Sequence, residues 1–303
     1  MSAEPGPEDP VVAAAPADDE ELESVELEER ALEDDAFERF DCTTGDTAPA
    51  VDAARRAVAA GDCIVLPTDT VYGIGADAFS AEAVQGLLDA KERGRDMPPP
   101  VLVGDASLIR ALATDVPDQA HELVEVHWPG PLTIVCRIQP SLRMDLGDAD
   151  GTIALRVPDH ALAREILRRT GPLAVSSANL SGHPAALTCD DAVDQLGDRV
   201  AVYLDGGALG SPRVEGPVDP GERHALPSTI VDFTRHDEGQ LLRRGALDLA
   251  TLRLVLPGLR DLDEPVAPNP TPPVTPTPTP PVTPTPPAAP QPDEPRVEPE
   301  PEG

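Results

Sequence analysis

The last 39 residues of the chain contain 17 prolines, so they cannot form part of a packed domain. Pro-Thr and Pro-Pro steps recur throughout this segment. Such a run adopts extended polyproline II structure, which has no internal hydrogen bonds and builds no core. We therefore expect a proline-rich disordered tail over residues 265–303.

The opposite end of the chain is dominated by carboxylates. Residues 1–41 carry 16 Asp and Glu against 2 Arg, with few large apolar side chains. Such a segment buries too little surface to offset the entropy lost on ordering. We expect an acidic, disordered arm over 1–41, which leaves residues 42–264 as one domain large enough for a proper core.

The charge and the cysteines exclude several classes of protein. A net charge of −32 opposes nonspecific binding to nucleic acid or anionic lipid, and it resembles the acidic proteins of salt-loving organisms. The four cysteines are scattered, so we expect neither a zinc site nor a disulfide framework. With no signal peptide and no apolar run of membrane-spanning length, the expected location is cytoplasmic, without membrane contact.

Apolar runs alternate with helical periods through the middle section, which predicts an α/β domain with a mixed, twisted sheet. We expect a first helix ending near Gly61, a second capped by Ser80, and further helices at 108–113, 119–127, 162–169 and 192–196. Strands are expected at 63–66, 101–103, 132–137, 152–157, 173–175, 200–204, 229–233 and 241–243.

Lys91 is the only lysine, and it stands with Arg93 and Arg95 at the end of the second predicted helix. A compact ammonium in an arginine-rich background is typical of a phosphate site. These cations are alternatively a solvated surface that complements the helix dipole. In a domain of net negative charge, their clustering favours an anion site, with a triphosphate as its ligand.

Four further segments carry polar side chains at the ends of predicted strands. Pro67–Gly75 is either an ordinary turn or a set of ligand donors, and Arg156 in the strand 152–157 requires an internal carboxylate or a bound anion. Ser176–Gly182 is a candidate phosphate or ribose cradle. We interpret Trp128, in the segment 127–133, as a packing residue.

No Walker loop, GxGxxG, GxSxG or HExxH motif is present. Taken in order, however, the segments resemble the YrdC family of threonylcarbamoyl-AMP synthases over about residues 55–252. The resemblance rests on Pro-Thr-x-Thr-Val-Tyr-Gly, Lys-x-Arg, Trp-Pro-Gly-Pro-Leu-Thr, Arg-Val-Pro, Ser-x-Asn-x-Ser-Gly, Ser-Thr and Leu-Arg-x-Gly. It implies an open, twisted mixed sheet with helices around a concave cleft, in a single-domain form of the family.

The resemblance also implies an ATP-dependent nucleotidyltransferase. The reaction joins L-threonine, bicarbonate and ATP into threonylcarbamoyl-AMP and pyrophosphate, and a separate transferase complex uses the product on tRNA. Contact with tRNA is expected to be indirect. Mg²⁺ is expected with the phosphates, because no carboxylate motif marks a protein-built metal site.

Residue roles follow from the same resemblance. Lys91, Arg93 and Arg156 are the candidate catalytic residues. The threonine site is implied to consist of Thr70, Arg156, Val175 and Ser228. The ATP site is implied to consist of Lys91, Arg93, Arg95, Thr152, Ser177, Asn179 and Arg243, with the choice between Arg93 and Arg95 open.

The chain departs from the family pattern after the Lys-x-Arg run. Pro99 and Gly104 stand where many members have an asparagine and a histidine, and two extra residues precede Pro100. Two alternative functions remain: an RNA-binding module of the same fold, and a nucleotide-binding paralogue that does not activate threonine. Tight RNA binding without ATP turnover would favour the first of these.

Overall fold

The computed structural model describes residues 37–212, 223–262 and 264. All of them belong to the first of two compact units, Met1–Ala267, while the second unit is Pro268–Gly303. The proline-rich tail and residues 1–36 of the acidic arm lie outside the described residues.

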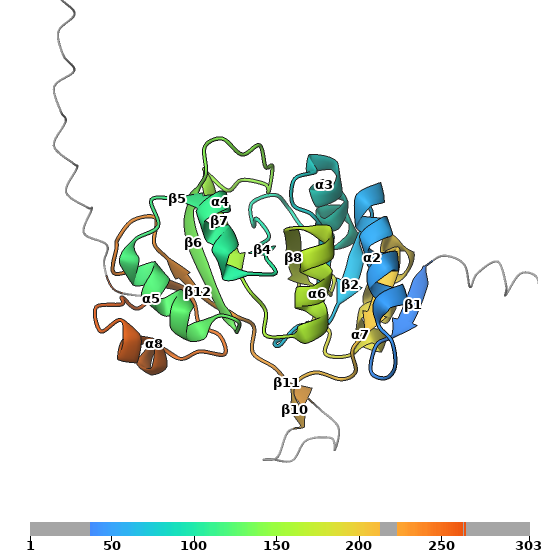
Figure 1. The fold of residues 1–303 in the computed structure, drawn as a ribbon. Helices are drawn as coiled ribbons and strands as arrows, with labels where there is room; N and C mark the ends of the chain where they lie inside the picture. The colour runs from blue at the N-terminus through green and yellow to red at the C-terminus, as the bar shows by residue number, and fades with distance from the viewer. Residues whose placement is uncertain (1–36, 213–222, 263, 265–303) are drawn as a thin grey trace, which may run out of the picture. The chain divides into compact units, whose positions relative to one another are not determined.

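Helices and strands alternate along the described chain, as the sequence pattern predicts (Figure 1). The helices are α2 (Ala48–Ala60), α3 (Ala81–Ala90), α4 (Ile109–Leu112), α5 (Asp118–His127), α6 (Ala161–Thr170), α7 (Cys189–Leu196) and α8 (Leu249–Val255), with 3-10 turns at Ala106–Leu108 and Gly197–Arg199. The strands are β1 (Glu38–Asp41), β2 (Ile64–Leu66), β3 (Gly73–Asp77), β4 (Val101–Leu102), β5 (Ala113–Thr114), β6 (Leu132–Ile138), β7 (Thr152–Arg156), β8 (Leu173–Ser177), β9 (Val202–Asp205), β10 (Ser211–Pro212), β11 (Arg223–His224), β12 (Thr229–Asp232) and β13 (Gln240–Arg243).

The main sheet is mixed and has the order β1-β9-β2-β3-β8-β4-β7-β6-β12-β13, with β5 beside β6. The pairs β1–β9, β2–β9, β4–β7 and β6–β12 are parallel, and the remaining pairs are antiparallel. The short strands β10 and β11 form a separate antiparallel pair. The expected mixed α/β sheet is confirmed.

In one half of the sheet, successive side chains of a strand pack into two different hydrophobic clusters, one on each face. Ile64 and Leu66 of β2 pack with α2 and α6, whereas Val65 between them packs on the opposite face with α3 and α7. Successive side chains of a strand point to opposite faces, so a short run of apolar residues can serve both layers. Helices α2 and α6 lie side by side on the first of these faces (Figure 1).

In the other half of the sheet, the described helices pack against one face. Ile134 of β6, Leu155 of β7 and Val231 of β12 pack with α5 and α8 in the largest hydrophobic cluster. Trp128 joins this cluster, and its indole N–H donates to the carbonyl of Leu132 at 2.7 Å. The packing interpretation of Trp128 is therefore confirmed. The opposite face of these strands carries polar side chains and forms part of the cleft described below.

Several elements differ from the sequence-based expectations. Strand β1 lies inside the segment assigned to the acidic arm, because its backbone pairs with β9 from Glu38 to Asp41 although three of its four side chains are charged. Strand β3 begins in the last third of the segment for which an ordinary turn was one interpretation, and its Gly73 and Gly75 pair with both β2 and β8. Helix α8 and the short strands β5, β10 and β11 were not predicted.

Local signals explain where the predicted helices begin and end. Gly61 has φ 93° and ends α2 in the left-handed conformation that glycine favours. The Ser80 hydroxyl accepts from the Ala83 amide at 3.1 Å and begins α3. No helix in the described ranges is long and apolar enough to cross a lipid bilayer.

Candidate active site

A cleft of about 400 Å³ opens on the polar face of strands β6, β7 and β12. It is bounded by the β2–β3 loop, the segment after α3, the end of β8, and the strands β12 and β13. Eight of the residues named from the sequence line it: Thr70, Arg93, Arg156, Val175, Ser177, Asn179, Ser228 and Arg243. Lys91, Arg95 and Thr152 do not.

The β2–β3 loop is organised by the hydroxyl of Thr68. This oxygen donates to the carbonyl of Val71 at 2.6 Å and accepts from the amides of Thr70 and Val71 at 3.1 and 3.3 Å. It also lies 3.0 Å from the hydroxyl of Thr70. A side chain that bonds its own turn in this way fixes the loop, and here it directs Thr70 towards Arg156.

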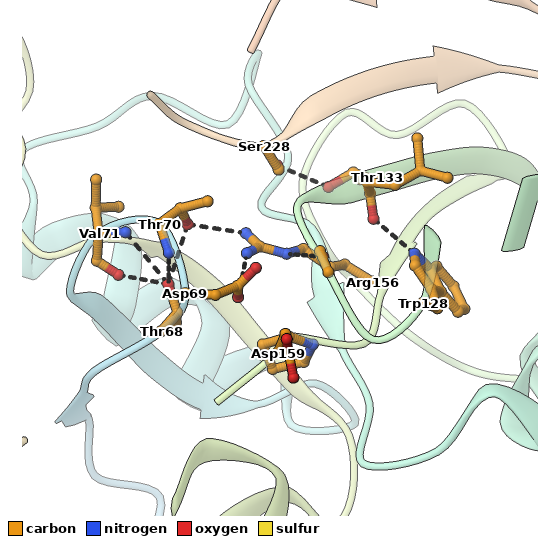
Figure 2. Close-up of polar contacts among 12 residues, drawn as sticks. Thr68, Asp69, Thr70, Val71, Trp128, Thr133, Arg156, Asp159 and Ser228 are labelled. Carbon is orange, nitrogen blue, oxygen red and sulfur yellow. Dashed lines mark hydrogen bonds and ion pairs between the residues drawn. The ribbon is translucent and has the colours of Figure 1, made fainter. Parts of the chain in front are cut away.

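Arg156 crosses the floor of the cleft, held on both sides (Figure 2). Its guanidinium donates to Asp69 at 2.6 Å, to Thr70 at 3.1 Å and to the carbonyl of Gly130 at 3.0 Å. Burial lowers the pKa of Arg156, an effect that Asp69 opposes, and the guanidinium stays charged. The internal salt bridge is confirmed. Arg156 also lines the cleft, and the bound anion that the sequence offered as the alternative stays a prediction.

Arg156 has donors to spare. Three of the five guanidinium N–H groups are used by Asp69, Thr70 and Gly130, which leaves one on each terminal nitrogen without a partner among the described residues. Each of these can donate to an oxygen of a carboxylate. Arg156 can therefore bind a second acid group besides Asp69.

Ser228 and Arg243 form a second polar group beside Arg156. Arg243 donates to the carbonyl of Ser228 at 2.8 and 3.0 Å and to its hydroxyl at 3.0 Å. The same hydroxyl lies 2.8 Å from that of Thr133 on β6, as Figure 2 shows. Burial lowers the pKa of Arg243, and the nearby charges of Arg156 and Arg93 lower it further.

The structure separates Arg93 from Arg95. Arg93 lines the cleft and donates to the Ser176 hydroxyl at 2.8 Å, and its buried Nε has no partner among the described residues. Arg95 instead pairs with Asp145 and donates to Gln85 at 3.1 Å. The geometry favours Arg93 as the phosphate ligand and places Arg95 outside the cleft, because Asp145 holds its guanidinium.

Lys91 lies behind the cleft wall. It ends α3, is only 2% exposed, and its ammonium bonds to the backbone carbonyls of Ser177 and Asn179. Burial, with a smaller contribution from Arg93, lowers its pKa to about 8. Lys91 is not among the residues that line the cleft. Its ammonium instead contacts the loop that does.

Thr152 stands at the far end of β7 from Arg156. Four steps along the strand, roughly 13 Å, separate the two. The Thr152 hydroxyl donates to the carbonyl of Ala149 at 2.6 Å. The implied contact between Thr152 and ATP stays a prediction.

The two positions that depart from the family pattern lie away from the cleft surface. Pro99 is buried, whereas its neighbours Pro98 and Pro100 line the cleft. A Cβ at Gly104 would lie 2.9 Å from Cγ of Arg168 on α6, so a larger side chain requires that arginine to move.

Positive charge exceeds negative charge in the cleft. Arg93, Arg156 and Arg243 all face it, and Asp69 is the one carboxylate paired with any of them among the described residues. In a chain of net charge −32 this excess is local and specific. Arginines arranged in this way bind phosphate and carboxylate groups. No group of three His, Cys, Asp or Glu side chains in the described ranges is arranged to hold a metal ion.

Three residues of the site were not singled out from the sequence. Asp69 was visible as the one carboxylate in the Pro67–Gly75 segment, and the expected need of Arg156 for a partner pointed to it. Ser176 and Thr133 stand in segments that were noted, but their roles depend on Arg93 and Ser228, each more than 80 residues away in the chain.

Comparison with known families matches residues 56–245 to the model named Sua5_yciO_yrdC, described as "Telomere recombination". A Mycobacterium tuberculosis (strain H37Rv) protein named "Putative threonylcarbamoyl-AMP synthase" is 51% identical over 198 residues, which cover 65% of this chain and 85% of that protein. The Bacillus subtilis threonylcarbamoyl-AMP synthase is 36% identical over 166 residues, 54% of this chain and 47% of that protein.

Solved structures agree with this comparison. Pyrococcus abyssi Sua5 complexed with L-threonine aligns with a TM-score of 0.65 at 27% identity, covering 74% of this chain and 62% of that chain. The Escherichia coli YciO structure aligns with a TM-score of 0.59 at 22% identity, covering 71% of this chain and 98% of that one, and it supports the fold alone.

Proposed function

The chain belongs to the Sua5/YciO/YrdC family, and from this premise we propose that it is a threonylcarbamoyl-AMP synthase. It is a transferase, and more narrowly a nucleotidyltransferase that makes threonylcarbamoyl-AMP and pyrophosphate from L-threonine, bicarbonate and ATP. The observation that carries the proposal is the buried Arg156, which keeps two donors without a partner among the described residues and faces two further arginines across one cleft.

L-threonine fits the part of the cleft around Arg156. Its carboxylate would accept charge-assisted hydrogen bonds from the remaining N–H groups of the guanidinium. The hydroxyls of Thr70 and Ser228 lie on either side, and Val175 provides an apolar surface in the same cleft. The Sua5 structure complexed with L-threonine supports threonine as a substrate.

The phosphates of ATP fit between Arg93 and Arg243. Neither guanidinium has a carboxylate partner among the described residues, and both stand beside serine hydroxyls. Ser177 and Asn179 line the same part of the cleft, where the Asn179 side-chain oxygen is buried without a partner in the described structure. A buried acceptor without a partner requires an explanation, and a nucleotide group bound beside it would provide one.

The chemistry demands little covalent work from the protein. The threonine nitrogen attacks the bicarbonate carbon, a C–N bond forms and water leaves, giving a carbamate. A carbamate oxygen then attacks the α-phosphorus, a P–O bond forms, and pyrophosphate departs with the electrons of the broken bond. The protein aligns the reactants and neutralises the phosphate charge, which is the task of Arg93 and Arg243.

Magnesium would accompany the phosphates. The described residues offer no carboxylate cluster for it, so the ion would be held by the nucleotide itself and would reduce the charge of the triphosphate. Transfer of the product to tRNA is assigned to a separate transferase complex.

The test is pyrophosphate release from ATP and bicarbonate with Mg²⁺, with and without L-threonine, in high-salt buffer. We expect release that depends on threonine and a product with the mass of threonylcarbamoyl-AMP. L-serine, which lacks one methyl group, serves as the matched control substrate. Binding of ATP without threonine-dependent release would contradict the proposal and would favour a nucleotide-binding paralogue.

A further inference from the structure

Lys91 makes three hydrogen bonds to one short loop. Its ammonium donates to the carbonyls of Ser177 and, at 2.5 Å, of Asn179, and its own carbonyl accepts from the amide of Ser181 at 2.9 Å. This loop, residues 177–181, begins with the last residue of β8. One residue at the end of α3 therefore holds this loop at its beginning, middle and end.

The two faces of the loop have different tasks. Ser177 and Asn179 both line the cleft, and their carbonyls bond to Lys91. Asn179 also donates to the carbonyls of Leu180 and His183 at 2.7 and 2.9 Å, so its amide orientation is set within the loop. Freedom in the loop backbone would consequently misplace both polar groups of the cleft.

The setting explains why an ammonium stands here. Lys91 is 2% exposed, and its contacts are backbone carbonyls rather than a carboxylate. A buried charge needs such hydrogen bonds, and a compact ammonium can meet two carbonyls where a planar guanidinium requires more room. This accounts for the one lysine in a chain whose other basic residues are all arginine.

We propose that Lys91 is a positioning residue that clamps the loop 177–181 from behind, so that Ser177 and Asn179 bind the nucleotide while Lys91 does not touch it. The proposal rests on the proposed function, because it assigns the loop to the ATP site. It replaces the direct phosphate contact that the family resemblance implies for Lys91.

A double-mutant cycle on ATP affinity distinguishes a Lys91 that positions the loop from a Lys91 that contacts the phosphates directly. Affinity is measured by calorimetry without threonine for Lys91→Met, Ser177→Ala and the double variant. If Lys91 acts through the loop, we expect each single variant to weaken binding about tenfold and the double variant to be at most about twofold weaker than the worse single one. Lys91→Met combined with Arg243→Ala is the control pair, for which the factors should multiply.

If the losses of ATP affinity in the two single variants multiply in the Lys91–Ser177 double variant, the proposal is overturned. Such independence is what a direct phosphate contact by Lys91 would give. The wild-type protein gives a second test that does not depend on any variant folding. Labelling with ¹⁵N-lysine yields one side-chain signal, from Lys91. We expect this signal to be protected from exchange in the free protein and nearly unchanged at saturating ATP. Protection that appears only with ATP would overturn the clamp.

Failure of the proposed function can be distinguished from failure of the clamp. If the wild-type protein binds no ATP, the synthase assignment fails, but hydrogen exchange in residues 177–181 still tests the clamp in the free protein. We expect Lys91→Met to raise amide exchange across this loop and to leave strand β6 unchanged. Unchanged exchange in the loop would contradict the clamp alone.

Discussion

Asp69 lies 2.6 Å from the guanidinium of Arg156, and the two side chains are 13% and 7% exposed. The carboxylate comes from the β2–β3 loop and the guanidinium from the end of β7, so one ion pair joins two strands that do not neighbour each other in the sheet. Because a buried charge without its partner is costly, Asp69 compensates the charge of Arg156 and fixes the direction of its guanidinium.

We therefore expect Asp69→Asn to raise the KM for threonine and to lower kcat/KM by about 10- to 100-fold, since a misdirected guanidinium loses roughly 1.5–3 kcal/mol of charge-assisted bonding. Asp159→Asn is the matched control, because Asp159 pairs with Arg164 at 2.7 Å but is 64% exposed. Steady-state kinetics with varied threonine measures both. Equal behaviour of the two variants would contradict a role for Asp69 in orienting Arg156.

Arg93→Ala should lower ATP turnover by about 100-fold, because loss of one donor aimed at developing phosphate charge costs roughly 3 kcal/mol. Arg95→Ala should stay within about twofold of the wild type, since Arg95 is bound to Asp145 and its exposed pair contributes little. Pyrophosphate release at saturating threonine measures the difference. A larger loss in Arg95→Ala than in Arg93→Ala would reverse the assignment.

Stability should depend on pH through Lys91. Its pKa falls from the ordinary 10.5 to about 8 in the folded protein, first through burial and then through Arg93. Between these values the unfolded chain holds a proton that the folded chain has released. The Lys91 contribution to the free energy of unfolding therefore rises with pH, by up to about 1.4 kcal/mol per pH unit.

The measurement is urea unfolding of the wild type and Lys91→Met at pH 7.5, 8.5 and 9.5. The difference between the two proteins isolates this one group from all other titrations. The wild type should gain stability relative to the variant as the pH rises. Parallel pH dependences would show that the Lys91 pKa is not shifted.

Gly73→Ala should destabilise the protein by about 1–3 kcal/mol, as overpacking does. A Cβ at Gly73 would lie 2.6 Å from Cγ1 of Val175 on the neighbouring strand. Val175→Ala removes that methyl group, so the double variant should recover part of the loss. Gly86→Ala is the control, because nothing lies within 4 Å of its added Cβ and alanine favours its helix. Thermal unfolding of the four proteins checks this, and no recovery in the double variant would contradict it.

Salt should stabilise the protein, since screening weakens the repulsion among the many carboxylates of a chain with net charge −32. Melting curves in dilute buffer and in multimolar KCl give the comparison. A melting temperature that falls with salt would rule out the halophilic interpretation of the composition.

Sequence patterns predicted the regular elements well where apolar periodicity was strong. Helix α6 and strands β6 and β7 appear close to their expected bounds, because each has one clearly buried face. Periodicity failed at β1, whose Glu38–Asp41 is held by backbone pairing with β9. It failed also at β3, where the glycines of Gly73–Gly75 are typical of a turn but here make room for the side chains of β8.

Among the site residues, too, some features could be predicted from the sequence and others could not. Motif order identified eight residues that the fold brings to one cleft, although no local pattern shows which way a side chain points. Arg93 and Arg95 are two positions apart, and what distinguishes them is Asp145, fifty residues further along the chain. The inward position of Lys91 depends on two carbonyls more than eighty residues away.

The single carboxylate among the three arginines of the cleft also bears on the end of the catalytic cycle. When the P–O bond breaks, pyrophosphate keeps most of the negative charge of the triphosphate, and Arg93 and Arg243 still face it. We expect the departing product to be a competitive inhibitor against ATP and to be slow to leave. The forward reaction should then proceed fastest where another enzyme hydrolyses pyrophosphate as it forms.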